Sequence, residues 1–188
     1  MEGGGQPIER RLSDGATLLI RPYCTTYAAA VRELFITVNR LMAPAELRAP
    51  FEAYVARALI DEIERIPAYY SERAGSFWIA TLSGELVGMF GLETVAAGAL
   101  ELRRMYVAPA ARRRGIAATL LDFAEHQSSL AGAGWLVLST SQLQQEALAL
   151  YRRSGYELER EELAETLSNK TSAAAFAATT SGSGSAPS

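Results

Sequence analysis

The order of the elements that the sequence predicts indicates an α+β fold, with a mixed, mostly antiparallel central sheet and helices on both faces. Three observations predict it. A strand near the N-terminus is followed by two amphipathic helices, three β-rich runs then follow one another closely, and the remaining sequence alternates helix, strand, helix and strand. Consecutive β-rich runs form a meander, and the alternating elements complete a sheet that helices cover.

The N-terminal third contains one predicted strand and two predicted helices. Residues 17–21 are a short apolar run that ends before a proline, which predicts a strand, and residues 27–42 predict a helix. A second helix follows Pro50, and Pro67 is expected to end it. Its apolar stripe recurs at helical spacing and includes a single polar residue, Glu62. The members of the stripe are Phe51, Tyr54, Val55, Ala58, Leu59, Glu62, Ile63 and Ile66.

The middle of the chain predicts a meander of three strands. Residues 77–81 and 86–95 are β-rich runs, and Ser83 and Gly84 between them predict a hairpin. Residues 100–107 continue the meander and end before a proline.

The last predicted elements begin after a run of arginines. A helix that starts there carries four apolar residues on its buried side, Ile116, Leu120, Phe123 and Ala124. Residues 135–140 are a short apolar run, as expected for a strand covered on both faces. Residues 144–153 then predict a helix, and residues 156–159 begin one more strand.

Length and composition favour one globular domain. The chain has 188 residues, of which 49% are apolar, enough for a sizeable core. A net charge of −3 and a pI near 5.3 argue against a nucleic-acid partner. Arg103, Arg104 and the three arginines at 112–114 nevertheless form a local basic patch. Such a patch in an acidic chain suggests one anionic ligand, although a solvated charged face would also explain some of these arginines.

Other features of the sequence predict where the protein is located in the cell and where its folded domain begins and ends. Cys24 is the only cysteine, which excludes an intrachain disulfide and a cysteine metal cluster, and no metal is expected. No stretch has the signature of a signal peptide or a membrane span, so we expect a cytoplasmic protein without a membrane partner. Residues 1–10 are expected to be a flexible N-terminus and residues 11–165 the folded domain. Residues 166–188, rich in Ala, Ser and Gly, are expected to be disordered.

The arginine run has the pattern of an anion-binding loop. In residues 112–117, an arginine is followed by two free positions, a glycine, a free position and a small residue. The backbone N–H groups of such a loop can all point at one anion, and at a helix start they form a pyrophosphate cradle. The alternative is a helix with a basic first turn. It is disfavoured, because three arginines at that end oppose the helix dipole unless an anion is bound.

Four motifs in order resemble the GNAT superfamily of N-acetyltransferases. Arg112, Gly115 and Ala117 match its acetyl-CoA loop, which reads Gln/Arg-x-x-Gly-x-Gly/Ala. A strand enters the loop, a second apolar strand follows about thirty residues later, and Leu150-Tyr151 leads into Gly155-Tyr156. The resemblance implies a sheet that is splayed at the acetyl-CoA strand, a second strand parallel to the first, and acetyl-CoA as co-substrate.

The resemblance also implies which residues bind the cofactor. The loop would hold the pyrophosphate, and the strand before it would pair with the pantetheine amides and supply an oxyanion donor. Family members often carry asparagine at the position of Gln144, where the side chain contacts the cofactor. The expected cofactor-binding residues are Met105, Tyr106, Val107, Arg112, Arg113, Arg114, Gly115, Ile116, Ala117, Ala118, Gln144 and Tyr151.

Two residues are catalytic candidates. By resemblance, Tyr151 is placed to protonate the departing CoA sulfur, whereas from the sequence alone it could be a core tyrosine. Glu101 lies eleven residues before Arg112, where some protein-acetylating family members have a glutamate base. An equally good reading pairs Glu101 with Arg103 as a strand-end ion pair. Strand alternation predicts Glu101, Arg103 and Met105 on one face, with residues 102, 104 and 106 on the other.

The segment 139–147 narrows the resemblance to the camello-like branch of the superfamily. Its members acetylate small α-amino compounds or protein lysines, and we expect this protein to differ from the animal members in having no membrane anchor. A carboxylate on an amino-acid acceptor would need a cation, for which Arg103 is the expected residue. Tyr69 and Tyr70 lie in the segment that usually lines the acceptor side, although they could equally be packing aromatics.

Three functions follow from the sequence. The first is an acetyl-CoA-dependent N-acetyltransferase acting on a small primary amine, and the second directs the same chemistry at protein lysines or N-termini. The third is a CoA-binding regulatory module without turnover. The sequence leaves monomer and homodimer open, and fold resemblance specifies the cofactor better than the acceptor.

Overall fold

The computed structural model, which describes residues 6–141, 144–163 and 172–179, contains one sheet of eight strands in the order β1-β2-β3-β4-β5-β6-β8-β7. β5 and β6 are parallel and the other neighbouring strands are antiparallel, so the predicted mixed, mostly antiparallel sheet is confirmed. The strands are β1 Ile8–Arg11, β2 Thr17–Pro22, β3 Ser76–Leu82, β4 Glu85–Ala96, β5 Ala99–Val107, β6 Trp135–Ser141, β7 Glu157–Leu163 and β8 Ser172–Thr179.

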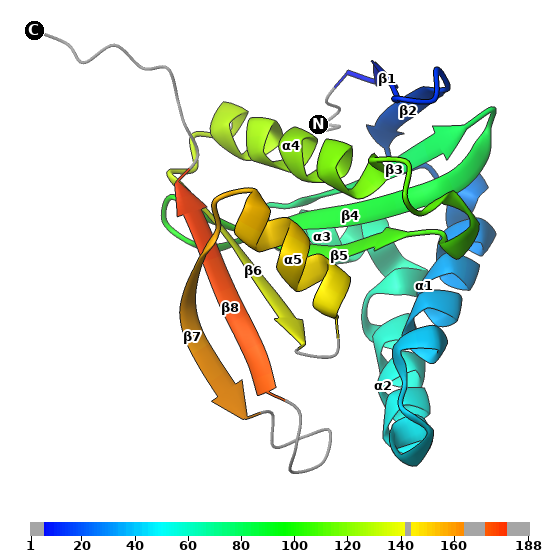
Figure 1. Cartoon of the computed structure of the whole chain (residues 1–188), viewed down its shortest axis with the longest axis vertical. Coiled ribbons are helices and arrows are strands. Elements are labelled where there is room, and N and C mark those ends of the chain that lie inside the picture. The colour runs from blue at the N-terminus through cyan, green and yellow to red at the C-terminus, as the bar shows by residue number, and fades with distance from the viewer. Residues whose placement is uncertain (1–5, 142–143, 164–171, 180–188) are drawn as a thin grey trace, which may run out of the picture.

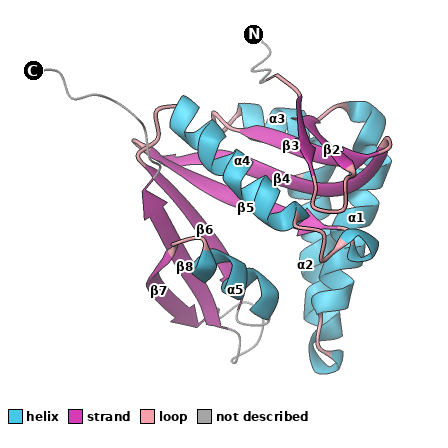
Figure 2. Ribbon diagram, turned by 45° about the horizontal axis from the view of Figure 1, so that its top comes forward, coloured by secondary structure: helices cyan, strands magenta, loops and turns pink. Residues whose placement is uncertain are grey.

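Helices cover both faces of the sheet, as predicted (Figures 1 and 2). On one face lie α1, α2 and α3, whose apolar side chains share a core with Phe77, Ile79 and Met89. On the other face lie α4 and α5, which pack on a second core that includes Trp78 and Phe90. The helices are α1 Ala28–Met42, α2 Arg48–Asp61, α3 Ile66–Ser71, α4 Ile116–Leu130 and α5 Gln145–Arg153.

Local sequence explains the hairpin and the helix that begins after the arginines. Ser83 and Gly84 have φ values of 50° and 86°, and two left-handed residues in a two-residue loop match the right-handed twist of the paired strands. Gly115, with a φ of 79°, is the N-cap of α4. The four residues predicted to face the core from α4 are all buried, at 4% exposure or less.

The second helix ends earlier than predicted. α2 stops at Asp61, and the chain leaves helical geometry at Glu62, whose φ and ψ are −135° and −62°. Pro67 does not end this helix but lies in the first turn of α3. A proline is tolerated there, because its missing N–H would have no partner inside the helix.

The structure corrects the expectations for both ends of the fold. β1 pairs with β2, so residues 8–10 belong to the sheet. β8 lies between β6 and β7, within the tail that was expected to be disordered. Composition describes the tail in isolation, whereas a strand flanked by two others finds partners for its backbone groups even when its side chains are small. Residues 1–5, 164–171 and 180–188 lie outside the described residues.

Candidate active site

β5 and β6 separate partway along their length, as the predicted splay requires. Their parallel pairing runs from Ala99 opposite Trp135 to Leu102 opposite Leu138, and the rest of β5 pairs only with β4 among the described strands. In Figure 1, β6, β8 and β7 diverge from the strands of the meander. A cavity of about 300 Å³ opens here, lined by Tyr54, Glu101, Leu102, Arg103, Arg104, Met105, Tyr106, Ser139, Thr140, Gln144 and Tyr151.

A β-bulge in β5 turns two consecutive arginines to the same face. Between the pairs Gly91–Arg103 and Met89–Tyr106, β5 has one residue more than β4, and Arg104 has a left-handed φ of 52°. Arg103 and Arg104 therefore both reach Glu62 on the α1–α3 face. The predicted alternation is wrong beyond Arg103, because a bulge shifts the order in which side chains point.

Glu62 is the centre of a buried polar network that the sequence analysis did not assign to the site. Its side chain is 2% exposed, and its Oε2 accepts hydrogen bonds from Arg104 Nε at 3.0 Å and Arg104 Nη2 at 2.6 Å. Tyr70 donates its hydroxyl to Oε1 at 2.8 Å. Arg104 also donates to the hydroxyl of Tyr54. Burial alone would raise the pKa of Glu62, but the two guanidinium groups and the Tyr70 hydroxyl outweigh it and hold the pKa below its usual value. The sequence feature that could have identified Glu62 as a site residue is its place as the one polar residue on an otherwise apolar helix stripe.

Arg103 is shared among three carboxylates. Its Nη1 donates to Glu93 Oε1 at 2.7 Å and lies 3.7 Å from Glu101 Oε2, and its Nη2 lies 3.4 Å from Glu62 Oε2. Tyr69, the first of the two tyrosines predicted on the acceptor side, lies with its ring centroid 5.8 Å from this guanidinium. Tyr69 and Tyr70 are both buried, and neither is among the described residues that line the cavity.

Glu101 lines the cavity and stands opposite Glu93 on β4. The Ser139 hydroxyl donates to its Oε1 at 3.5 Å. Partial burial raises the pKa of Glu101; Arg103 lowers it, and the nearby charge of Glu93 raises it. The predicted ion pair with Arg103 is present, and the same carboxylate also faces the cavity.

Tyr151 projects from α5 into the same cavity, together with Gln144 at the start of that helix. Its side chain is 6% exposed, and its ring centroid lies 5.9 Å from that of Tyr156. Burial, and secondarily the neighbouring Tyr106, raise the pKa of the Tyr151 hydroxyl far above its ordinary value. The raised pKa keeps the phenol protonated at neutral pH, as a proton donor must be before it acts.

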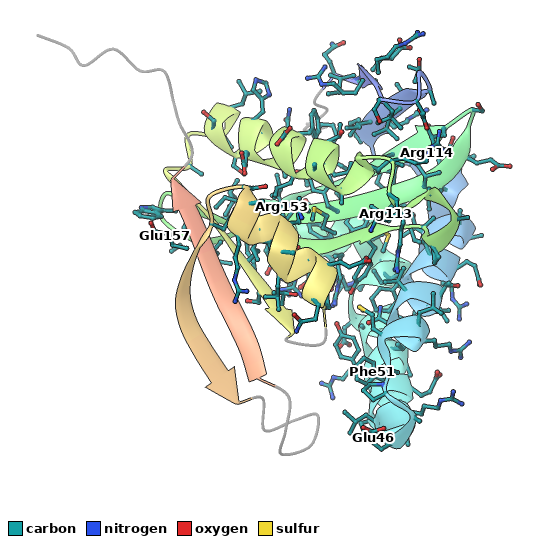
Figure 3. All side chains as sticks on the ribbon, viewed as in Figure 1. Glu46, Phe51, Arg113, Arg114, Arg153 and Glu157 are labelled. Atoms are coloured by element: carbon teal, nitrogen blue, oxygen red, sulfur yellow. The ribbon has the colours of Figure 1, made fainter. Side chains whose placement is uncertain are left out.

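The arginine loop connects β5 to α4, so the strand that lines the cavity leads directly into the predicted cradle. Arg113 is left-handed, with a φ of 63°, two residues before the left-handed Gly115. The N–H groups of the first turn of α4 have no acceptor inside the helix, which suits an anion. Arg112 and Arg113 are exposed, whereas Arg114 Nε donates to Asp14 Oδ2 at 2.6 Å. Figure 3 labels Arg113 and Arg114 in this loop.

A larger cavity of about 450 Å³ lies at the opposite end of β4 and β5, beside the end of α4. None of the described residues that line it is ionisable, and none of them is a predicted site residue. General acid–base chemistry therefore favours the smaller cavity. In the described part of the chain, no helix combines the length and the apolarity of a membrane span, and no group of three or more His, Cys, Asp or Glu could hold a metal ion.

Comparison with known proteins agrees with this geometry. Residues 73–158 match the acetyltransferase (GNAT) domain family. N-acetyltransferase family 8 member 3 from Rattus norvegicus is 33% identical over 114 residues, which are 57% of this chain and 50% of that protein. N-acetyltransferase 8 from Homo sapiens is 33% identical over 119 residues, which are 58% of this chain and 51% of that protein. The chain thus spans about half the length of these curated relatives, and the resemblance predicted from its motifs is confirmed.

A solved structure with the same fold contains the cofactor. The spermidine N-acetyltransferase from Vibrio cholerae, in complex with CoA and spermine, is similar with a TM-score of 0.66 at 15% identity, over 87% of this chain and 95% of that chain. At this identity the likeness concerns the fold alone.

Proposed function

Since residues 73–158 match the acetyltransferase (GNAT) domain family, we propose that the whole protein is an acetyl-CoA-dependent N-acetyltransferase that acts on a primary amine. The observation that supports this best is the cavity between the separated strands, because a protonated buried phenol and a carboxylate both line it. Amide formation from a thioester needs one group to take a proton from the amine and another to give a proton to the thiolate.

The cofactor residues suit a long anionic ligand that begins at the cradle and ends in the cavity. Residues 112–118 would hold its pyrophosphate at the N-terminus of α4, with Arg112 and Arg113 exposed beside it. The part of β5 beyond its pairing with β6 would pair with the amides of the ligand, through Met105, Tyr106 and Val107. Gln144 also lines the cavity and would contact the ligand there. Bound acetyl-CoA would supply the acetyl group as an activated thioester.

Glu101 and Tyr151 would divide the proton transfers. Glu101 would accept a proton from the incoming ammonium group, directly or through a water molecule. A backbone N–H of β5 would stabilise the oxyanion. Tyr151 would donate its phenolic proton to the departing thiolate, whose ordinary pKa of about 8.5 lies below that of a phenol. Because this transfer runs uphill between the two groups in water, the site must stabilise the transfer for Tyr151 to act as the acid.

Replacing Tyr151 with phenylalanine is expected to lower kcat by about 100-fold, within the range of a lost general acid, while the Kd for CoA stays unchanged. Steady-state kinetics and calorimetry measure the two quantities. The matched control is Tyr156→Phe, because the Tyr156 ring packs beside Tyr151 without lining the cavity. Wild-type turnover in the Tyr151 variant would remove the acid role.

Replacing Glu101 with glutamine is expected to remove the acid limb of the pH profile of kcat/KM. A base works only when it is deprotonated, and the raised pKa of Glu101 places this limb above the range of a free glutamate, which titrates near 4.3. In Glu93→Gln the limb should persist but shift to lower pH, because the charge of Glu93 raises the pKa of Glu101. An acid limb that persists in the glutamine variant of Glu101 would exclude the base assignment.

For the acceptor we consider first a small amino-acid-like amine. Arg103 would bind its carboxylate, with the Tyr69 ring beside that guanidinium. One observation favours a second candidate, an amine without a carboxylate, such as a lysine side chain or a protein N-terminus. Three glutamates already surround Arg103, so an incoming carboxylate would meet their negative charge.

The function is tested by a thiol-release assay with acetyl-CoA on paired acceptors, each amino acid beside its amide, together with S-substituted cysteines, polyamines and lysine peptides. Turnover of amino acids but not their amides would support the first acceptor class, and the reverse would support the second. Calorimetric binding of CoA runs in parallel. Tight CoA binding without turnover on every amine would replace the enzyme with a CoA-binding regulatory module.

A further inference from the structure

The hydroxyl of Thr140 is buried and has no hydrogen-bond partner among the described residues. The side chain is 5% exposed, and its Oγ1 makes no hydrogen bond to any residue that the structure describes. A hydroxyl removed from water without a new partner lowers stability, so such groups in a well-packed protein call for an explanation. Thr140 lines the cavity between the separated strands, where a ligand could supply the missing partner.

Strand geometry places this hydroxyl on the cofactor side. Thr140 lies two residues beyond Leu138, the last residue of β6 that pairs with β5. Leu136, Leu138 and Thr140 are buried on one face of β6, whereas Ser139 points to the other face, where it contacts Glu101. Thr140 therefore shares its face with the core that contains Tyr151, away from the acidic acceptor side.

We infer that Thr140 is a cofactor-binding residue whose hydroxyl forms a hydrogen bond with acetyl-CoA at the thioester end of its pantetheine arm. The inference rests on the proposed function. Met105 and Tyr106 form the opposite wall of the cavity, and Tyr151 lies at its α5 side, so the hydroxyl stands where the cofactor would pass from the strand to the proton donor. Valine has nearly the same shape as threonine, so packing alone does not require a hydroxyl at this position.

The test compares Thr140→Val with Thr140→Ser in the full chain. The valine variant should bind CoA and acetyl-CoA about tenfold more weakly, as expected for one lost hydrogen bond and the polar group left unmatched on the ligand. Adenosine 3′,5′-bisphosphate, which lacks the pantetheine arm, should bind as it does to wild type. Serine should restore CoA affinity. In urea, the ligand-free valine variant should unfold at the same or a higher midpoint, because it removes an unpartnered buried hydroxyl.

The control is Thr81→Val, the same change at a buried threonine of β3 outside the cavity, which should leave the affinity for CoA unchanged. Wild-type CoA affinity in the valine variant would overturn the inference, and so would an equal loss for adenosine 3′,5′-bisphosphate. If the valine variant does not fold, Thr140→Ala gives the same comparison between CoA and the nucleotide. Wild-type protein that binds no CoA would overturn the proposed function as well, which separates the two failures.

Discussion

Replacing Glu62 with alanine is expected to lower the free energy of unfolding by about 3–5 kcal/mol, a large share of the stability of a domain of this size. The variant keeps the Arg104 guanidinium in its place beside the Phe35 ring but removes its ion-pair partner. It also removes the acceptor of the buried Tyr70 hydroxyl. Urea unfolding followed by circular dichroism measures the loss.

The matched control is Glu52→Ala, which also removes a glutamate held by an arginine through two hydrogen bonds, of 2.7 and 2.9 Å to Arg40. The side chains of Glu52 and Arg40 are 49% and 60% exposed, so water replaces the lost contacts. The urea midpoint of this variant should therefore stay near that of wild type. Equal losses in the two variants would contradict the role of burial. Because the pKa of Glu62 is lowered in the fold, its charge contributes fully above about pH 4.3, and this contribution is lost as the pH falls through the folded-state pKa.

Replacing Gly115 with glutamate is expected to weaken CoA binding by at least about 100-fold. The change places a carboxylate in the proposed cradle, where it repels phosphate and blocks two or more charge-assisted hydrogen bonds of about 1.5–3 kcal/mol each. A Cβ at this position meets no atom within 4 Å, so the protein itself has space for the side chain. The cost to folding is the left-handed φ of 79°, about 1–2 kcal/mol. Calorimetry measures the affinity, and urea unfolding measures the folding cost.

Gly132→Glu is the control at the other end of α4. Gly132 also has a left-handed φ, of 76°, and its Cβ would also meet no atom within 4 Å. The two substitutions should lower the free energy of unfolding by similar amounts, but only the one at Gly115 should weaken CoA binding. Normal affinity in the Gly115 variant would remove the cradle assignment.

Local patterns predicted the parts of the fold that local chemistry determines. The hairpin at Ser83 and Gly84 and the buried face of α4 depend on residues close together in the chain, so local periodicity is sufficient to find them. The separation of β5 from β6 and their parallel pairing could be predicted only from the family resemblance. The local sequence of either strand does not indicate at which residue their pairing ends.

The missed features depend on contacts between distant residues. The bulge at Arg104 occurs where its guanidinium meets Glu62, forty-two residues earlier, and strand periodicity contains no information about that partner. The unpartnered Thr140 could not be recognised before its surroundings were known, since a threonine in a strand is ordinary. The composition of residues 172–179 did not predict β8, because hydropathy does not report which strands a segment pairs with through its backbone.

The position of β8 sets the order in which this protein can be completed. Ribosomes release the chain from the N-terminus, and residues 172–179 emerge after every other described strand, yet they lie between β6 and β7. Until then, both neighbours expose unpaired edges, which are sites of mispairing and aggregation. The meander and α4, whose contacts are closer in sequence, can form earlier. The wall of the cavity that β6 provides therefore gains its second neighbouring strand only after residues 172–179 have emerged.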